Sequence, residues 1–520
     1  MGKAVARDAW PARRALRGAL RGGAPARRGR RTDRPGRAPG RGRRSASRLG
    51  HHGAGRRGAD GRFRRLGSAP GGPRHCLRAP APRLRRGADR DGDGVEAKSP
   101  ARLRPRVARV AHRSRAYRGA LLRGGAAKSA GGDAVTRGIG LYVHVPFCAS
   151  RCPYCDFATA PATTALRGRY LEALGREIAR EGDLLGRPRV RTLFFGGGTP
   201  SLLEPAEIER LGDDLRRAFV FRPREVTLEA NPATLDRARL DAWLALGLTR
   251  LSLGAQSFDA SGLRALGRTH QPEDSGAAVA VAREARLDVN LDLIFGWPGQ
   301  TVAAWESDLD IAAALGPDHV SCYPLELRLD PDGSIPNWPG GGWPVLERWR
   351  AAAAAAQPDD AGIARMYRVA ERSLGRAGYR HYEIANWARP QKRSLHNLGY
   401  WRDRDWLGVG AGAHTHLAGA RSANPADLRA YIARVESGSA RAIDADADPP
   451  SENAMLALRL DSGLDLERYA ARFGDTAATR VRTALREVEP AHLVQVRGRH
   501  ARLTARGRLL ASEVFIRLLP

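Results

Sequence analysis

The sequence predicts an α/β fold, a partial (β/α)6 TIM-like barrel followed by a C-terminal, mostly helical, winged-helix-like domain. Two observations predict the barrel: short apolar segments alternate with stretches of helical periodicity, and polar residues collect directly after those segments. Near the C-terminus, amphipathic stretches surround one alternating segment, which predicts the second domain. A chain of 520 residues has ample length for a sizeable core.

Six segments have the apolar composition of parallel strands that are covered on both faces. Between them, stretches such as RYLEALGREIAREGDLL and EIERLGDDLRRAF have the spacing of amphipathic helices. In a βα barrel the carboxyl ends of the strands build the active site, so we expect one functional site at that end. The predicted strands are Leu141–Val145, Thr192–Phe195, Val226–Ala230, Arg250–Ala255, Val289–Phe295 and His319–Leu325.

The net charge of +32 is concentrated in the N-terminal quarter of the chain. Residues 1–138 contain 38 Lys and Arg against 8 Asp and Glu, whereas the remainder contains 49 against 47. Arg, Ala, Gly and Pro dominate this quarter without hydrophobic periodicity, so we expect residues 1–137 to be disordered. These residues are either a basic arm that binds nucleic acid or an acidic membrane surface, or an upstream extension that results from a misassigned start codon. We favour the extension, with no specific nucleic-acid partner and no role for Cys76.

No segment has the roughly 18 uncharged apolar residues of a transmembrane helix, and the N-terminal residues lack the apolar stretch of a secretory signal. We therefore expect a cytoplasmic protein with reduced cysteines. The predicted domains are the extension 1–137, the barrel 138–380, a segment 381–445 that contains HNLGYW, and the C-terminal domain 446–520.

Three of the five cysteines, Cys148, Cys152 and Cys155, lie within eight residues, on a loop after the first predicted strand. Thiolates are soft ligands that favour iron–sulfur clusters or zinc. A four-iron cluster usually takes four cysteines, so three would leave one iron with an open coordination position. The alternative is a zinc site completed by His144, which we disfavour because His144 is not at a usual zinc spacing.

The cysteine motif, with Tyr154 before its last cysteine, resembles the signature of radical S-adenosylmethionine (radical SAM) proteins. In that superfamily the open iron binds the amino and carboxylate groups of S-adenosylmethionine (SAM), and electron transfer cleaves SAM to a 5′-deoxyadenosyl radical. The segments FFGGGTPSLL, TLEANP, RLSLGAQSF and LDLIFGWPGQT resemble the coproporphyrinogen-dehydrogenase-like group. The resemblance extends from Gly138 to the C-terminus and implies the radical SAM form of the partial barrel.

Two branches of this group differ in sequence at two places that can be compared with this chain. The oxygen-independent coproporphyrinogen III dehydrogenases (HemN type) carry a fourth cysteine where this chain has Phe157. The heme chaperone branch, HemW, has phenylalanine there and an His-Asn-x-x-Tyr-Trp motif, which His396–Trp401 reproduces. The resemblance thus implies a chaperone that binds heme, a 4Fe-4S cluster and SAM and delivers heme to an acceptor protein, for example one of the respiratory chain.

Two alternatives remain, so the sequence leaves open whether the protein is an enzyme. One is a coproporphyrinogen III dehydrogenase, which decarboxylates two propionates oxidatively to give protoporphyrinogen IX in porphyrin biosynthesis. The lesser alternative is nucleic-acid binding through the basic arm.

The resemblance also implies roles for single residues. A structural ion pair is the alternative role for Arg268 and Asp292, and His414 and His416 are further candidate heme ligands. Cys322 lies in an apolar strand, where we expect a buried, inert thiol. The implied roles are Cys148, Cys152 and Cys155 as cluster ligands; Tyr142, Tyr154, Gly197, Gly198, Thr199 and Glu229 around SAM; Gln256, Arg268 and Asp292 around a second SAM; and His396, Tyr400 and Trp401 as heme-binding residues.

Overall fold

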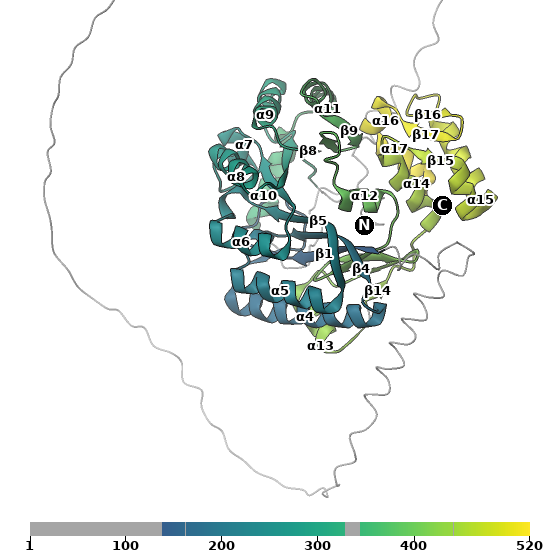
Figure 1. Cartoon of the computed structure of the whole chain (residues 1–520). Helices are drawn as coiled ribbons and strands as arrows, with labels where there is room; N and C mark the ends of the chain where they lie inside the picture. The colour runs from purple at the N-terminus through teal and green to yellow at the C-terminus, as the bar shows by residue number, and fades with distance from the viewer. Residues whose placement is uncertain (1–137, 162, 328–343, 440) are drawn as a thin grey trace, which may run out of the picture. The chain divides into compact units, whose positions relative to one another are not determined.

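The computed structural model describes residues 138–161, 163–327, 344–439 and 441–520 (Figure 1). The predicted N-terminal extension, residues 1–137 with Cys76, lies outside the described residues. The described part is built on one mixed sheet of twelve strands with helices packed against it, followed by a smaller, mainly helical region. This arrangement confirms the predicted α/β class.

Six adjacent parallel strands form the centre of the sheet, and each predicted strand overlaps one of them. Every neighbouring pair in this series is parallel, which requires a crossover between successive strands. The strands, in their order across the sheet, are β1 (Ile139–Val145), β4 (Arg189–Gly197), β5 (Val220–Ala230), β6 (Arg250–Gln256), β7 (Asp288–Phe295) and β8 (His319–Pro324).

Shorter strands extend both edges of this parallel centre. Next to β1 lies the parallel strand β11, and the other added strands run antiparallel to their neighbours. Within the described ranges no pairing joins the two outermost strands, so the sheet is an open, partial barrel. The added strands are β11 (Trp406–Val409), β12 (His414–Leu417), β13 (Ala420–Ala423) and β14 (Ala442–Ile443) on one side, and β10 (Asn386–Ala388) and β9 (Arg380–Glu383) on the other.

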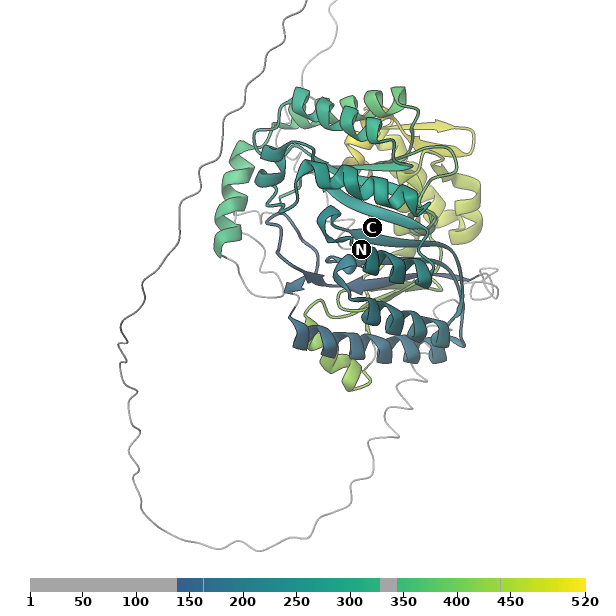
Figure 2. The same cartoon turned by 60° about the vertical axis from the view of Figure 1, so that its left-hand side comes forward.

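The crossover helices cover the outer face of the sheet (Figures 1 and 2). Several begin at a side-chain cap, such as Asp236 before α6 and Thr301 before α9. Three of them, α4, α6 and α9, end at a glycine with positive φ. The helices on the outer face are α4 (Thr164–Leu185), α5 (Pro205–Ala218), α6 (Arg237–Leu246), α7 (Ala260–Ala265), α8 (Pro272–Glu284), α9 (Val302–Leu315), α11 (Asp360–Arg376) and α13 (Leu428–Glu436). Helix α10 (Pro344–Ala356) contacts the loop after β1 instead, through Arg350.

Alternation along the strands gives the sheet two different faces. On β1, Leu141, Val143 and Val145 are fully buried and belong to the main hydrophobic core, whereas Tyr142 and His144 point to the opposite, inner side. The inner face is more polar than the apolar composition of the strands predicted. It carries buried polar side chains that include Thr227, Ser252, Asn290, His319 and Ser321.

The C-terminal region has its own core and the predicted winged-helix-like character. Its helices surround a three-stranded sheet in which the predicted alternating segment forms a hairpin of β16 and β17. A buried ion pair between Arg421 and Glu452 connects this region to the large sheet. Its elements are α14 (Pro449–Arg459), β15 (Leu464–Asp465), α15 (Leu466–Val488), β16 (Val494–Arg497), β17 (His500–Leu503), α16 (Ala505–Leu509) and α17 (Ala511–Phe515).

None of the helices in the described residues is long and apolar enough to cross a membrane.

Candidate functional site

The three clustered cysteines lie on the loop that leaves β1 at its carboxyl end. Cys148 ends the short strand β2 (Phe147–Cys148), which pairs with β3 (Ala160–Pro161) and so closes the base of the loop. All three thiols are free and partly buried, and Thr199 Oγ1 donates a hydrogen bond to Cys148 Sγ at 3.5 Å. Burial raises the pKa of the Cys148 thiol, and it raises the pKa of Cys155 to about 12. These thiols therefore need a nearby cation to ionise at neutral pH.

Arginines from distant elements hold the cysteine loop. Arg350, a buried residue of α10, donates from Nε to the carbonyl oxygen of Pro153 at 3.0 Å and from Nη2 to Asp156 Oδ1 at 2.9 Å. Arg268 Nη1 lies 3.5 Å from Cys152 Sγ. The positive charges at this edge suit a loop that carries thiolates.

The donor set of the loop fits a cluster better than a single zinc ion. Within the described ranges, no three His, Cys, Asp or Glu side chains converge as ligands of one ion do. Both ring nitrogens of His144 are engaged, Nδ1 with the Tyr142 hydroxyl at 3.0 Å and Nε2 with the carbonyl oxygen of Ala158 at 2.8 Å. Burial lowers the pKa of His144 to about 4. The remaining donors are three thiols, the number that leaves one iron of a four-iron cluster open.

Two glycines at the end of β4 allow close contact with the strand that leads to the cysteines. Gly197 has φ +114°, and a Cβ there would lie 2.4 Å from the His144 ring. A Cβ on Gly198 would lie 2.5 Å from the carbonyl carbon of Pro146. Both positions therefore require glycine.

Glu229 at the end of β5 faces the same turn. Its Oε2 accepts a hydrogen bond from the Gly197 N–H at 3.0 Å. Burial, together with the charge of Asp292, raises its pKa to about 7 even though the Gly197 hydrogen bond opposes this shift. The fold therefore brings Gly197, Gly198, Thr199 and Glu229 to the cysteine end of the sheet, as predicted for one functional mouth.

The residues expected around a second SAM lie in two groups. Arg268 Nη2 donates to the carbonyl oxygen of Gly254 at 3.0 Å, close to Gln256, which has φ +64°. Asp292 lies deeper on β7 and accepts hydrogen bonds from Ser252 Oγ at 2.8 Å and Asn290 Nδ2 at 2.9 Å. Within the described residues Arg268 and Asp292 make no ion pair with each other.

The two tyrosines expected near the cofactor belong to different surfaces. Tyr142 is on the inner face of β1, with its ring stacked on Phe194 at a centroid distance of 6.1 Å. Tyr154, between the second and third cysteines, packs against a small apolar cluster that includes Leu266 and Trp297. Phe157, which follows the last cysteine, is 63% exposed.

The HNLGYW segment forms α12 (Leu395–Trp401), whose N-terminus is capped by a buried carboxylate. Glu225 accepts hydrogen bonds from the backbone N–H groups of Leu395 at 2.7 Å and His396 at 2.8 Å. The His396 ring is buried, with Nδ1 2.9 Å from Thr192 Oγ1 and Nε2 2.7 Å from the Tyr400 hydroxyl. Burial lowers the pKa of His396 to about 3, so the ring is neutral.

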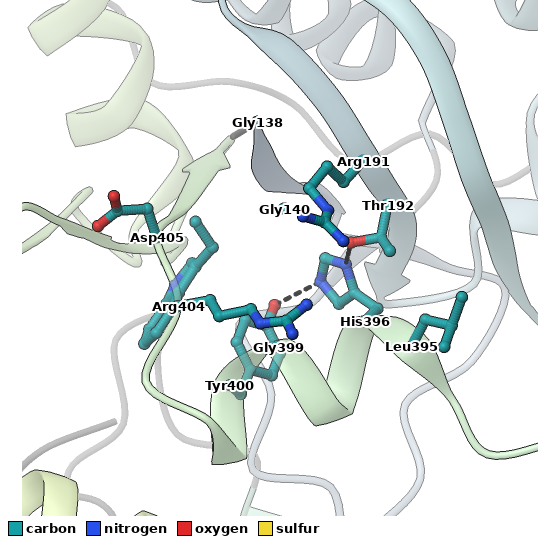
Figure 3. Close-up of a pocket in the computed structure, with 11 residues that line it drawn as sticks. Gly138, Gly140, Arg191, Thr192, Leu395, His396, Gly399, Tyr400, Arg404 and Asp405 are labelled. Carbon is teal, nitrogen blue, oxygen red and sulfur yellow. Dashed lines mark hydrogen bonds between the residues drawn. The ribbon is translucent and has the colours of Figure 1, made fainter. Parts of the chain in front are cut away.

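The structure brings His396 and Tyr400 together but places them away from the cysteines. They line a small pocket at the amino ends of β1 and β4 (Figure 3). The cysteine loop leaves the carboxyl end of β1. Seven residues of β1 separate the two ends by about 20 Å. Trp401 is partly buried on the C-terminal side, where the Arg459 guanidinium lies 4.3 Å from its ring centroid.

The two other histidines considered as heme ligands differ in exposure. His416 is buried between the Trp406 ring and Asp403, with Nε2 3.5 Å from Asp403 Oδ1. His414 is exposed at the start of β12. Cys322 is completely buried, as expected, and burial raises its pKa.

Comparisons with known proteins agree with this arrangement. The family model of the radical SAM superfamily matches residues 142–312, and that of the HemN C-terminal domain matches residues 445–510. The chain is similar to the heme chaperone HemW of Mycobacterium tuberculosis, with 37% identity over 396 residues that cover 73% of this chain and 94% of that protein. It is 30% identical to the heme chaperone HemW of Bacillus subtilis, with 72% and 97% covered.

Among solved structures, coproporphyrinogen III oxidase (HemN) from Escherichia coli, a radical SAM enzyme, is similar with a TM-score of 0.64. Its sequence identity is 26%, and the match covers 74% of this chain and 92% of that one.

Proposed function

Because the chain belongs to the HemW family of the radical SAM superfamily, we propose that it is a heme chaperone that binds heme, a 4Fe-4S cluster and SAM and passes heme to an acceptor protein. The superfamily implies the cluster and SAM. That this chain binds heme and delivers it to an acceptor is our proposal.

The observation that carries the proposal is the separation of the HNLGYW helix from the cysteine loop. A substrate of radical chemistry has to lie beside SAM, at the carboxyl ends of the strands. A ligand at α12 lies toward the amino end of β1, whereas the cysteine loop leaves its carboxyl end. A porphyrin held there would not take the place of a substrate beside the cysteines, and the protein would carry it unchanged.

The residues at the cysteine end have a consistent set of roles. Cys148, Cys152 and Cys155 would hold the cluster, which when bound supplies the electron that cleaves SAM. The SAM methionyl group would meet backbone groups of the turn at Gly197 and Gly198, which packs closely on His144 and Pro146. The other proposed contacts of this SAM are Tyr142, Tyr154, Thr199 and Glu229. The proposed contacts of a second SAM are Gln256, Arg268 and Asp292.

Glu229 is suited to hold the nucleoside of SAM. A carboxyl group with a pKa of about 7 can accept hydrogen bonds from ribose hydroxyls when ionised and can donate one when protonated. The ionised form of Glu229 becomes favourable once hydrogen-bond donors on SAM replace the water that burial has removed.

At the other end, His396, Tyr400 and Trp401 are the proposed heme-binding residues. For His396 to ligate heme iron, its Nε2 would exchange the Tyr400 hydroxyl for the metal, while Thr192 keeps the ring orientation through Nδ1. The neutral ring has the protonation state that a metal ligand needs.

A direct experiment adds ferric heme or, separately, coproporphyrinogen III to anaerobically purified protein with its cluster intact. Ferric heme should bind with micromolar or better affinity, about −8 kcal/mol or more favourable, and be recovered unchanged. His396→Ala should weaken heme binding, whereas His492→Ala, an exposed histidine of the C-terminal region, should not.

The second candidate function is that of a coproporphyrinogen III dehydrogenase, which the similarity to HemN favours. Incubation with coproporphyrinogen III, SAM and a reductant separates the two. Protoporphyrinogen IX formation, with heme bound no better than by an unrelated protein, would reverse our order.

A further inference from the structure

Strand β6 ends in a bulge at the carboxyl edge of the sheet, the edge that the cysteine loop leaves. Between the pairs Leu253–Leu291 and Gln256–Leu293, β6 contains one residue more than its parallel neighbour β7. A bulge of this kind changes the direction of a side chain, and bulges are common beside functional sites. The side chain at the end of this bulge is that of Gln256, which is among the proposed SAM contacts.

The backbone at Gln256 is strained. Gln256 has φ +64°, and the Ser257 N–H donates to the carbonyl oxygen of Ala255 at 2.8 Å, which closes a three-residue turn centred on Gln256. A turn of this size with a positive φ at its centre is rare and strained for a residue that has a Cβ. Such a conformation persists only where its surroundings hold it, and it is therefore a guide to function.

Two buried side chains hold the turn from either side. Asp308, a residue of α9 that is 1% exposed, accepts hydrogen bonds from Ser257 Oγ at 2.8 Å and from the Phe258 N–H at 2.7 Å. The buried ring of His270 donates from Nε2 to the carbonyl oxygen of Ala255 at 3.2 Å. The turn is thus fixed before and after its central residue, and relaxation of that residue would disturb these contacts.

The Gln256 side chain lies beside Arg268. An ideal Cβ on Gly254 would lie 2.8 Å from Gln256 Nε2 and 3.5 Å from Arg268 Nη2, so both groups face one backbone position that has no side chain of its own. Arg268 Nη1 in turn lies 3.5 Å from Cys152 Sγ. Within the part of the chain that the structure describes, the Gln256 amide makes no hydrogen bond. No contact of this amide in the fold therefore offsets the strain of the turn.

We propose that Asp308 and His270 are positioning residues, which hold the strained turn so that the Gln256 amide meets SAM beside Arg268. This inference rests on the proposed function. The strain is present in the folded protein before SAM binds, so the amide needs no rearrangement when it forms its hydrogen bond.

The first test is Gln256→Gly on anaerobically purified protein with its cluster intact. Glycine adopts a positive φ without the Cβ penalty, so the midpoint of thermal unfolding should rise by about 1–3 °C. Because the amide is lost, one SAM-binding step should weaken about fivefold or more, measured by equilibrium dialysis. A residue that only supports the fold would not give higher stability together with weaker binding.

The matched control is Arg286→Gly, at an exposed residue after α8 that has φ +57°. It relieves a positive φ of the same kind away from the proposed SAM contacts. The unfolding midpoint should therefore rise similarly, and the affinity for SAM should stay within about twofold of the parent value.

The second test asks whether Asp308 acts through Gln256. Asp308→Asn should weaken SAM binding about threefold in the parent protein and change it by less than about 1.5-fold when Gln256 is already glycine, because the two residues then share no effect. His270→Phe, which removes the hydrogen bond to Ala255, should show the same dependence on Gln256.

Unchanged SAM binding or a lower unfolding midpoint in Gln256→Gly would overturn the inference. Equal losses from Asp308→Asn in both backgrounds would also overturn it, since Asp308 would then support the fold in general. If the unaltered protein with its cluster bound no SAM, the proposed function itself would fall, and this inference with it.

Discussion

Arg350 Nη2 lies 2.9 Å from Asp156 Oδ1, although the two residues are 194 positions apart in the chain. The same guanidinium donates to the carbonyl oxygen of Pro153, between the second and third cysteines. Helix α10, which follows the six central strands in the sequence, therefore fixes the conformation of the cysteine loop before any cofactor binds.

The first prediction follows from this contact. Arg350→Ala should leave the fold intact but loosen the loop, because it removes a buried charge-assisted hydrogen bond worth about 1.5–3 kcal/mol. We expect a lower iron content after anaerobic purification and faster loss of the cluster absorbance in air. Arg350→Lys, which keeps the charge but loses the planar fork of the guanidinium, should be intermediate.

The comparison variant is Arg376→Ala, which alters a largely exposed arginine on α11 paired with Glu306 at 3.8 Å. It should leave the iron content unchanged. An Arg350→Ala protein with full iron and unchanged oxygen sensitivity would show that the loop needs no such support.

The second prediction concerns the cysteines. Cys148→Ala, Cys152→Ala and Cys155→Ala should each abolish the iron and the absorbance of an oxygen-sensitive four-iron centre, because each removes one of three protein ligands. Cys322→Ala, which alters a fully buried thiol of the core, should keep both. Full iron in any of the three loop variants would be inconsistent with their role as ligands.

The third prediction uses the raised pKa of Glu229, about 7 against an ordinary value of 4.5. Between these values the folded state holds a proton that the unfolded state has lost, so the free energy of unfolding falls as the pH rises through this window. Glu229→Gln removes this titration. Without SAM, the variant should gain about 1–3 kcal/mol over the parent protein above pH 7, and much less near pH 4.5.

Denaturant unfolding of the cluster-free protein at several pH values measures this difference. A difference between the two proteins that does not change with pH would contradict the assignment of the raised pKa to Glu229. Glu172→Gln, at a side chain on α4 that is 55% exposed, is the matched control for the loss of one carboxylate.

The central strands could be predicted from sequence because each is a local apolar run, such as 289–295, whose signal does not depend on its partners. The edge strands could not, because β14 has only two residues and pairs with β13 through antiparallel contacts that no local pattern encodes. The polar inner face was also missed, since composition does not say which face of a strand the helices cover.

The candidate site divides in the same way. The cysteines were found because their spacing is local, whereas Arg350 and Glu225 act on groups that only folding brings near them. HNLGYW was identified from the sequence, but nothing in the motif indicated that it would lie at the amino ends of the strands.

The fourth prediction concerns a buried carboxylate that the sequence did not indicate. Glu177 on α4 accepts five hydrogen bonds, and this set ties the first crossover helix to the segment after β11. Glu177→Ala should lower the free energy of unfolding by about 3–5 kcal/mol, because it removes the buried carboxylate that pairs with Arg434 and shares Arg441 with Glu181. The donors are the Gly410 N–H at 2.8 Å, Asn424 at 2.9 Å, Tyr431 at 2.8 Å, Arg434 at 2.6 Å and Arg441 at 3.0 Å.

Glu172 on the same helix is the matched control. Its side chain is 55% exposed and lies 3.9 Å from Arg176. Glu172→Ala should cost less than about 1 kcal/mol, as exposed ion pairs do. Similar losses in the two variants, measured by denaturant unfolding, would show that the buried set adds nothing specific.

The last prediction tests whether the two ends of the barrel act independently. If heme binds at α12, its proposed contacts His396 and Tyr400 bond to each other and to Thr192 rather than to the cysteines, and mutational effects are additive when no partners are shared. A protein with Cys148, Cys152 and Cys155 all changed to Ala should therefore bind heme within about twofold of the parent affinity. Conversely, Trp401→Ala should weaken heme binding while the iron content of the cluster stays complete. Heme titrations followed by the Soret absorbance, with iron analysis of the same samples, measure both. A loss of heme affinity above about tenfold in the cysteine variant would place heme at the cluster end of the sheet instead, where a porphyrin could be a substrate.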